Sequence, residues 1–216
     1  MNDVELEKKF ELAEVIDLVN FAEVIKSLSE LVGVQIRIFD LQSAEIFDSG
    51  GERVFCGSIR STAVGERVCQ EVKGKMLGQF LGEGSALQLQ SACGNKYTVF
   101  PIRHQFENLG RVVLGPYQDP GLDLTRLEQI AAKFRIDPQK FVSGYKEMPE
   151  LAPERLKKMA RFMARFFDAF VFVNAKRLIT SMMHLELIMN SRDKIFQEME
   201  REGADKKELE KLKGMF

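Results

Sequence analysis

The chain has 216 residues, enough for one well-buried domain with an appendage or for two small domains. Hydrophobic residues make up 45% and charged residues 29%, and the net charge of −1 excludes an overall basic field for nucleic acid or anionic lipid. No charged patch leads into an apolar run at the N-terminus, and the most apolar stretch, 162–173, contains Arg165 and Asp168 and is too short to span a bilayer. We therefore expect a cytoplasmic protein with no direct nucleic-acid or membrane partner.

The N-terminal part of the chain predicts helices followed by two strands. Apolar residues recur at three- and four-residue steps over 4–32, with Asn20 as a candidate cap and Gly33 as a candidate stop. Residues 34–39 alternate between apolar and polar and include β-branched side chains, which indicates a strand. A turn and a short return strand over 44–47 follow.

The middle of the chain predicts helix and then three strands. Residues 56–60 form a short helix or an irregular segment, and 62–81 carry the spacing of an amphipathic helix. Three predicted strands follow, at 86–91, 96–104 and 110–117. Asn108–Gly110 would supply the turn between the last two strands. Two strands, then helices, then three strands predict an α+β fold in which helices cover one face of a five-stranded antiparallel sheet.

The C-terminal part predicts three helices. Asp123 or Thr125 begins the first, and Asp137-Pro138 begins a second, short one. From Pro153 onward no Pro or Gly occurs until Gly203, and a long helix is expected there. Its apolar positions keep a mostly three-four spacing: Leu156, Met159, Met163, Phe166, Phe170, Val173, Leu178, Met182, Leu185 and Met189.

A helix of that length is unusual in a globular domain, and we expect its seam to be buried on a second copy or in a helical bundle. We therefore predict a domain over 1–148 and a helical dimerisation extension over 149–216. The cations between Arg155 and Arg165 could attract nucleic acid, but Glu150, Glu154 and the low net charge favour a solvated helix face.

Three cysteines are the main candidates for chemistry. Cys56, Cys69 and Cys93 cannot form a disulfide framework in a reducing compartment, because their number is odd. No short-spaced pair indicates zinc, although the thiols could still converge in space. A nucleophilic thiol needs a nearby histidine, and His104 is the one candidate within the predicted domain. We interpret the cysteines as buried or pocket-lining residues and expect no metal, no cofactor and no catalytic residues.

Residues 12–145 carry a distinctive order of cysteines, glycines and strands: Leu28–Gly33, Ile36–Asp40, Phe55-Cys56, Gly65, Cys69 and Pro101-Ile102. This order resembles the PocR-type sensory domain, a PAS-like ligand-binding module of bacterial signalling proteins. One element departs from the family pattern. Counted back from Pro101, Gly94 holds the family's glycine position, but Ser91 and Ala92 stand where the family has Cys and His, and Cys93 is displaced by two positions.

The resemblance implies a sensory or regulatory protein that is not an enzyme. It would bind a small ligand in a PAS-like pocket and signal through a dimeric C-terminal helix to a partner protein. Arg60 could clamp a carboxylate or phosphate there, although a surface arginine is the simpler interpretation. The predicted pocket residues are Phe39, Phe55, Cys56, Ser58, Arg60, Cys69, Ser91, Cys93, Tyr97 and Tyr117.

Two other functions remain open from the sequence. The loss of the Cys-His pair favours a protein-interaction adaptor or scaffold with a vestigial pocket. An enzyme using the same cleft is the third possibility, but the chain offers poor residues for it. Because relatives are usually fused to kinases, diguanylate cyclases or DNA-binding helices, we expect the output to come from a partner or from a segment outside this chain.

Overall fold

The computed structural model describes residues 11–15, 18–50, 54–79, 81, 86–104 and 107–201. Contacts divide the chain into two compact units, Met1–Phe172 and Val173–Phe216. The first unit contains five strands: β1 (Ile36–Asp40), β2 (Glu45–Asp48), β3 (Leu87–Gln90), β4 (Lys96–His104) and β5 (Glu107–Tyr117). They form one sheet in the order β2-β1-β5-β4-β3, and every neighbouring pair is antiparallel. The predicted α+β fold with a five-stranded antiparallel sheet is confirmed.

The described helices begin largely where the sequence predicts. Thr62, Asp123 and Asp137 each accept a hydrogen bond from the backbone N–H three residues later, which satisfies a donor that has no partner inside the helix. None of the helices in the described ranges combines the length and apolar character needed to cross a membrane. Their bounds are α1 (Leu12–Val15), α2 (Leu18–Val32), α3 (Val54–Arg60), α4 (Ala63–Gly78), α5 (Leu124–Phe134), α6 (Pro138–Lys146) and α7 (Pro153–Arg201).

Two local predictions, the cap of the N-terminal helix and the turn of the last hairpin, differ from the structure. Asn20 is not a cap, because α2 already begins at Leu18; residues 4–10 and 16–17 of the predicted helical segment lie outside the described residues. The predicted turn at 108–110 is wrong, since β5 starts at Glu107. Gly110 is needed inside the sheet instead: a Cβ there would collide with the carbonyl oxygen of Phe39 on β1.

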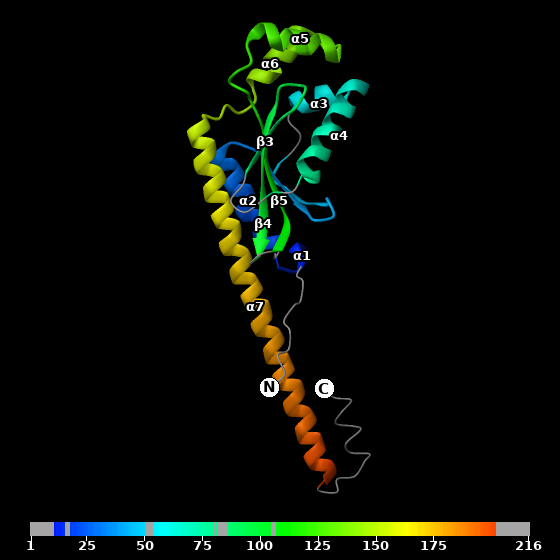
Figure 1. Cartoon of the computed structure of the whole chain (residues 1–216), viewed down its shortest axis with the longest axis vertical. Helices are drawn as coiled ribbons and strands as arrows, with labels where there is room; N and C mark the ends of the chain where they lie inside the picture. The colour runs from blue at the N-terminus through cyan, green and yellow to red at the C-terminus, as the bar shows by residue number, and fades with distance from the viewer. Residues whose placement is uncertain are drawn as a thin grey trace. The chain divides into compact units, whose positions relative to one another are not determined.

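Helices cover both faces of the sheet, not one face as predicted (Figure 1). On β4, Val99 is buried in a cluster with Val72 and Met76 of α4. The next residue, Phe100, points the opposite way and its ring centroid lies 6.1 Å from that of Phe167 on α7. Phe21 of α2 joins it, 5.6 Å from Phe167. Thus α4 covers one face, and α2 with the first part of α7 covers the other.

The predicted seam of α7 is partly wrong. The predicted seam positions Phe166 and Phe170 are only half-buried, and Val173 is 62% exposed. The buried positions follow a row with four-residue steps, the ridge direction that helices commonly use in packing. They are Met159, Met163, Phe167, Val171 and Ala175.

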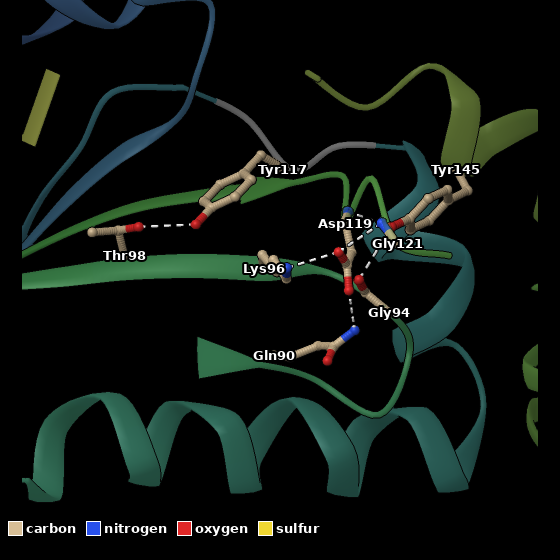
Figure 2. A network of polar contacts seen from close by, with 8 residues as sticks. All are labelled: Gln90, Gly94, Lys96, Thr98, Tyr117, Asp119, Gly121 and Tyr145. Carbon is tan, nitrogen blue, oxygen red and sulfur yellow. Dashed lines mark hydrogen bonds and ion pairs between the residues drawn. The ribbon is translucent and has the colours of Figure 1, made fainter. Parts of the chain in front are cut away.

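The carboxylate of Asp119, just after β5, joins two other strands (Figure 2). It accepts hydrogen bonds from Gln90 Nε2 at 2.6 Å and from the Gly121 N–H at 3.0 Å, and pairs with Lys96 Nζ at 2.7 Å. Its side chain is only 11% exposed. These contacts fix the ends of β3, β4 and β5 against one another.

The backbone of Asp119 extends this network to α6. Its N–H donates to the Tyr145 hydroxyl at 2.7 Å, and that hydroxyl donates to the Gly94 carbonyl oxygen at 3.1 Å. Tyr145 is buried in the core that α5 and α6 share with α3. The network therefore ties the β3–β4 turn to the helices that follow the sheet.

We predict that Asp119→Asn lowers the free energy of unfolding by about 1–3 kcal/mol at pH 7. Burial raises the pKa of Asp119, but hydrogen bonds from Lys96, Gly121 and Gln90 lower it by more than burial raises it. The pKa of Asp119 in the folded protein therefore lies below its ordinary 3.8. The contribution of the Asp119 carboxylate to the free energy of unfolding is therefore complete above the unfolded-state pKa. It is lost as the pH falls through the depressed folded-state pKa. Urea denaturation from neutral pH down through the pKa of Asp119 measures this. The difference in free energy of unfolding between the wild type and Asp119→Asn should decrease as the pH is lowered.

Asp193→Asn serves as the matched control, because this carboxylate is 57% exposed and pairs only with the adjacent Arg192 in the described chain. We expect Asp193→Asn to lower the free energy of unfolding by less than about 0.5 kcal/mol. Equal effects of the two substitutions would contradict the role given to Asp119.

Candidate functional site: a cavity between the sheet and α4

A cavity of about 250 Å³ lies between α4 and the face of the sheet that α4 covers. Its walls also include residues of α3, β1, β2 and β5, and Gln35 just before β1. The inner wall carries Tyr97 from β4 together with Val72 and Met76 from α4. The cavity therefore lies against the sheet face that α4 covers.

Four predicted pocket residues line this cavity: Cys56, Arg60, Cys69 and Tyr97. Phe39 is buried next to it, in the cluster that also contains Tyr97 and Val72. Its ring lies 5.9 Å from the guanidinium carbon of Arg37 and 5.6 Å from Lys73 Nζ. Phe39 therefore supports two cations of the cavity wall.

The other five predicted residues lie elsewhere in the structure. Phe55 belongs to the core shared with α5 and α6. The Ser58 hydroxyl donates to the carbonyl oxygen of Phe55 at 2.8 Å. Ser91 and Cys93 contact each other at 2.7 Å between Oγ and Sγ in the β3–β4 turn, and Cys93 is also part of that core. Tyr117 bonds to Thr98, 2.9 Å between hydroxyls, away from the cavity (Figure 2).

Two glycines allow close packing around the cysteine-bearing segments. Gly65 lies in the first turn of α4, where a Cβ would collide with the carbonyl oxygen of Ile59 in α3. Gly94 has a φ of +93°, and a Cβ there would lie 2.6 Å from Leu122. The first approach places α4 against α3, and the second places the β3–β4 turn against the segment that precedes α5. As a result Cys56 and Cys69 pack against the core cluster that contains Cys93.

The environment of Cys56 and Cys93 keeps these two thiols protonated. Burial, with smaller contributions from Cys93 and Cys69, raises the pKa of Cys56 to about 12 despite Arg60 and Arg37. Burial also raises the pKa of Cys93, although its hydrogen bond to Ser91 opposes this. Neutral thiols are poor nucleophiles and poor metal ligands. Across the ranges that the structure covers, no group of three His, Cys, Asp or Glu residues is placed to hold a metal ion.

Asn95 is a functional candidate that sequence reasoning missed. Its side chain is 1% exposed, and Nδ2 donates to Cys56 Sγ at 3.7 Å. Its Oδ1 has no hydrogen-bond partner among the described residues. The neighbouring Tyr97 has a pKa raised by burial, with the Asn95 side chain opposing the rise. Asn95 does not itself line the cavity but contacts Cys56, which does, so the neutral and weakly polar groups of the wall are those of Cys56 and Tyr97.

The outer wall of the cavity is charged and balanced, with Arg37, Arg60 and Lys73 against Glu45, Asp48 and Glu66. Arg37 Nε is buried and has no hydrogen-bond partner within the described chain. Asp48 accepts from Gln35 Nε2 at 2.7 Å. A signal for part of this set exists in the sequence: Glu66, Lys73 and Met76 share a helix face with Cys69 at three- and four-residue steps.

An antiparallel sheet with a cavity under one covering helix is the architecture of a PAS-like sensory module. The chain matches the family model described as the sensory domain found in PocR over residues 14–174, and it therefore belongs to this family. No curated protein and no solved structure matches the chain. The family match extends beyond the 12–145 range of the sequence resemblance to include the first part of α7.

We predict that iodoacetamide alkylates Cys56 very slowly in the folded protein. A rise of its pKa from 9.0 to about 12 lowers the thiolate fraction at pH 8 about a thousandfold. Peptide mapping by mass spectrometry should show the Cys56 peptide unmodified while a small-molecule thiol reacts completely. Guanidinium unfolding should restore fast labelling. Alkylation of native Cys56 at the unfolded rate would rule out the buried, neutral thiol.

Proposed function

We propose that this sensory domain binds a small molecule in the cavity between the sheet and α4 and relays its occupancy through α7 to a partner protein. The observation that carries the proposal is the convergence of Cys56, Arg60, Cys69 and Tyr97 on one internal space. Ligand pockets typically have volumes of roughly 300–1,000 Å³. At about 250 Å³ this one suits a ligand of a few heavy atoms.

The chemistry of the walls supports a binding role and not a catalytic one. The pKa values of Cys56 and Tyr97 are raised by burial, so both groups remain neutral at physiological pH and can donate hydrogen bonds without reacting. The unpartnered Nε–H of Arg37 offers a further donor to a ligand acceptor. We place the protein in the cytoplasm, where a small metabolite would reach this cavity directly.

The route from the cavity to a partner is α7. Its first part belongs to the compact unit that ends at Phe172, and the same continuous helix runs on through the second unit to Arg201. The helix begins at Pro153, close to the proposed division between a sensory part over 1–148 and a signalling part over 149–216. A change in the packing of the sheet on α7 would therefore act on a helix that is shared by both compact units.

We further propose that α7 dimerises through its second half. Leu178, Met182, Leu185 and Met189 follow four-three-four steps, the spacing of a two-stranded coiled coil. Met182, Leu185 and Met189 are 38%, 61% and 54% exposed in the single chain. Pairing with a second copy would bury this seam and place two sensory domains on one helical element.

Filling the cavity should abolish ligand binding. We expect Cys69→Phe to remove any small molecule that co-purifies with the wild type, as seen by native mass spectrometry. A panel of short-chain alcohols, carboxylic acids and amines is also screened for compounds that raise the melting temperature of the wild type. The most effective compound should not stabilise Cys69→Phe. Such stabilisation would be about 2.7 kcal/mol at a ligand concentration of 100 times Kd.

Val64→Phe is the matched control, because it adds a phenyl group to the same helix at an exposed position outside the cavity. It should leave ligand binding intact. If the wild type carries no molecule and no panel member stabilises it, the pocket is vestigial and the adaptor function replaces the sensory one.

Light scattering at micromolar concentration tests dimerisation. Met182→Glu with Leu185→Glu should convert a wild-type dimer into monomers, because each copy would place two carboxylates in an apolar seam. Met183→Glu with Leu187→Glu adds the same charge outside the seam and should leave the dimer intact. A monomeric wild type would instead make the exposed seam a docking site for a different protein.

A further inference from the structure

A second, larger cavity lies on the opposite face of the sheet. It is a groove of about 1070 Å³ between one flank of α7 and the β3–β4 hairpin. All of its lining residues belong to the first compact unit. Its floor includes Phe100 and Pro101 of β4, and Phe172, which is 58% exposed, lies at one end. Nothing in the proposed function uses this groove.

The α7 wall of the groove carries a regular row of cations. Lys157, Arg161 and Arg165 are exposed, lie at four-residue steps, and form no ion pair with any residue that the structure describes. Acidic residues bracket the row, with Glu154 three residues before it and Asp168 three residues after it. Along the α7 wall, three basic residues are therefore flanked by one acidic residue at each end. The steps between successive charges are three, four, four and three residues.

Small side chains lie between the cations and the floor of the groove. Ala160, Ala164 and Ala169 line the same wall of α7, and Ala86 lines the opposite side before β3. Alanine at these positions leaves room for another backbone to approach at the 8–10 Å typical of packed helices. Apolar and small residues at the base with charges along one edge make a surface suited to an amphipathic element.

We propose that this groove docks an amphipathic helix of the partner protein, with three carboxylates at four-residue steps facing Lys157, Arg161 and Arg165. The inference rests on the partner that the proposed function includes. Side chains four residues apart on a helix repeat every ~6 Å, which equals the repeat of the cations on α7. Alternate residues of a strand repeat every ~6.7 Å and would lose register along the row.

The charge pattern also argues against two other occupants. A second copy of this part of α7 would place like charges against one another, because its flank carries the same row. A nucleic acid is a continuous polyanion, and Glu154 and Asp168 would repel it at both ends of a row only ~12 Å long. A helix with three carboxylates in register would complement the three cations of the row.

Fluorescence anisotropy with a labelled synthetic helix tests the proposal on the full chain. The probe carries three Glu at four-residue steps, a Lys three residues beyond each end, and an adjacent Ala/Leu face. A second peptide has the same composition with its charges scattered. At about 0.15 M ionic strength we expect the patterned peptide to bind at least about tenfold more tightly than the scattered one.

Two matched double variants locate the binding site. Arg161→Glu with Arg165→Glu should weaken binding of the patterned peptide about tenfold or more. Arg155→Glu with Lys158→Glu changes the net charge equally on the same helix but outside the groove, and should change the affinity less than about threefold. All four positions are exposed, and circular dichroism should show unchanged folding.

Several results would overturn the proposal. These are no binding of the patterned peptide, equal binding of the two peptides, equal losses in the two double variants, or tighter binding of a duplex DNA probe. None of these results depends on the ligand cavity or on the dimer seam. Failure of the docking groove is therefore distinguishable from failure of the sensory function, which Cys69→Phe and the light-scattering variants test.

Discussion

The strand β5 is paired along both edges and buried on both faces, and this double burial sets the arrangement of the first unit. Val113 faces α4, while its neighbours Val112 and Leu114 face the side of α2 and α7. Each face must therefore carry helices to exclude water from apolar side chains. Coverage of both faces is incomplete: a small cavity lies beneath α4, and a larger groove lies beside α7.

Both cavities are lined in part by β4. Tyr97 lines the proposed ligand cavity, whereas Thr98 and Phe100 line the proposed docking groove. The Asp119 network holds the start of this strand through Lys96, and holds the adjoining turn through Tyr145. One strand, anchored at one end, thus separates the proposed ligand from the proposed partner helix. If both proposals hold, a shift of this strand would connect ligand binding to partner docking.

The candidate site was partly predictable from sequence. Cys56 and Cys69 could be found because cysteines spaced among glycines stand out and because their order resembles the PocR pattern. Asn95 could not be found, since a single asparagine in a turn is ordinary and only the contact with Cys56 marks it. In the sequence, Arg37 is an ordinary polar residue of an alternating strand. Only the tertiary structure shows that its Nε is buried without a hydrogen-bond partner among the described residues.

For the fold, the sequence alone determined the order and type of the elements, because periodicity, caps such as Asp137, and the absence of Pro and Gly from α7 after Pro153 are local properties. Which face each helix covers was decided by the tertiary structure. It also decided that Phe167, and not Phe166, is the buried residue of α7, since both fit a helical seam. The reason is that a side chain's burial depends on the surface opposite it, which comes from segments distant in the chain.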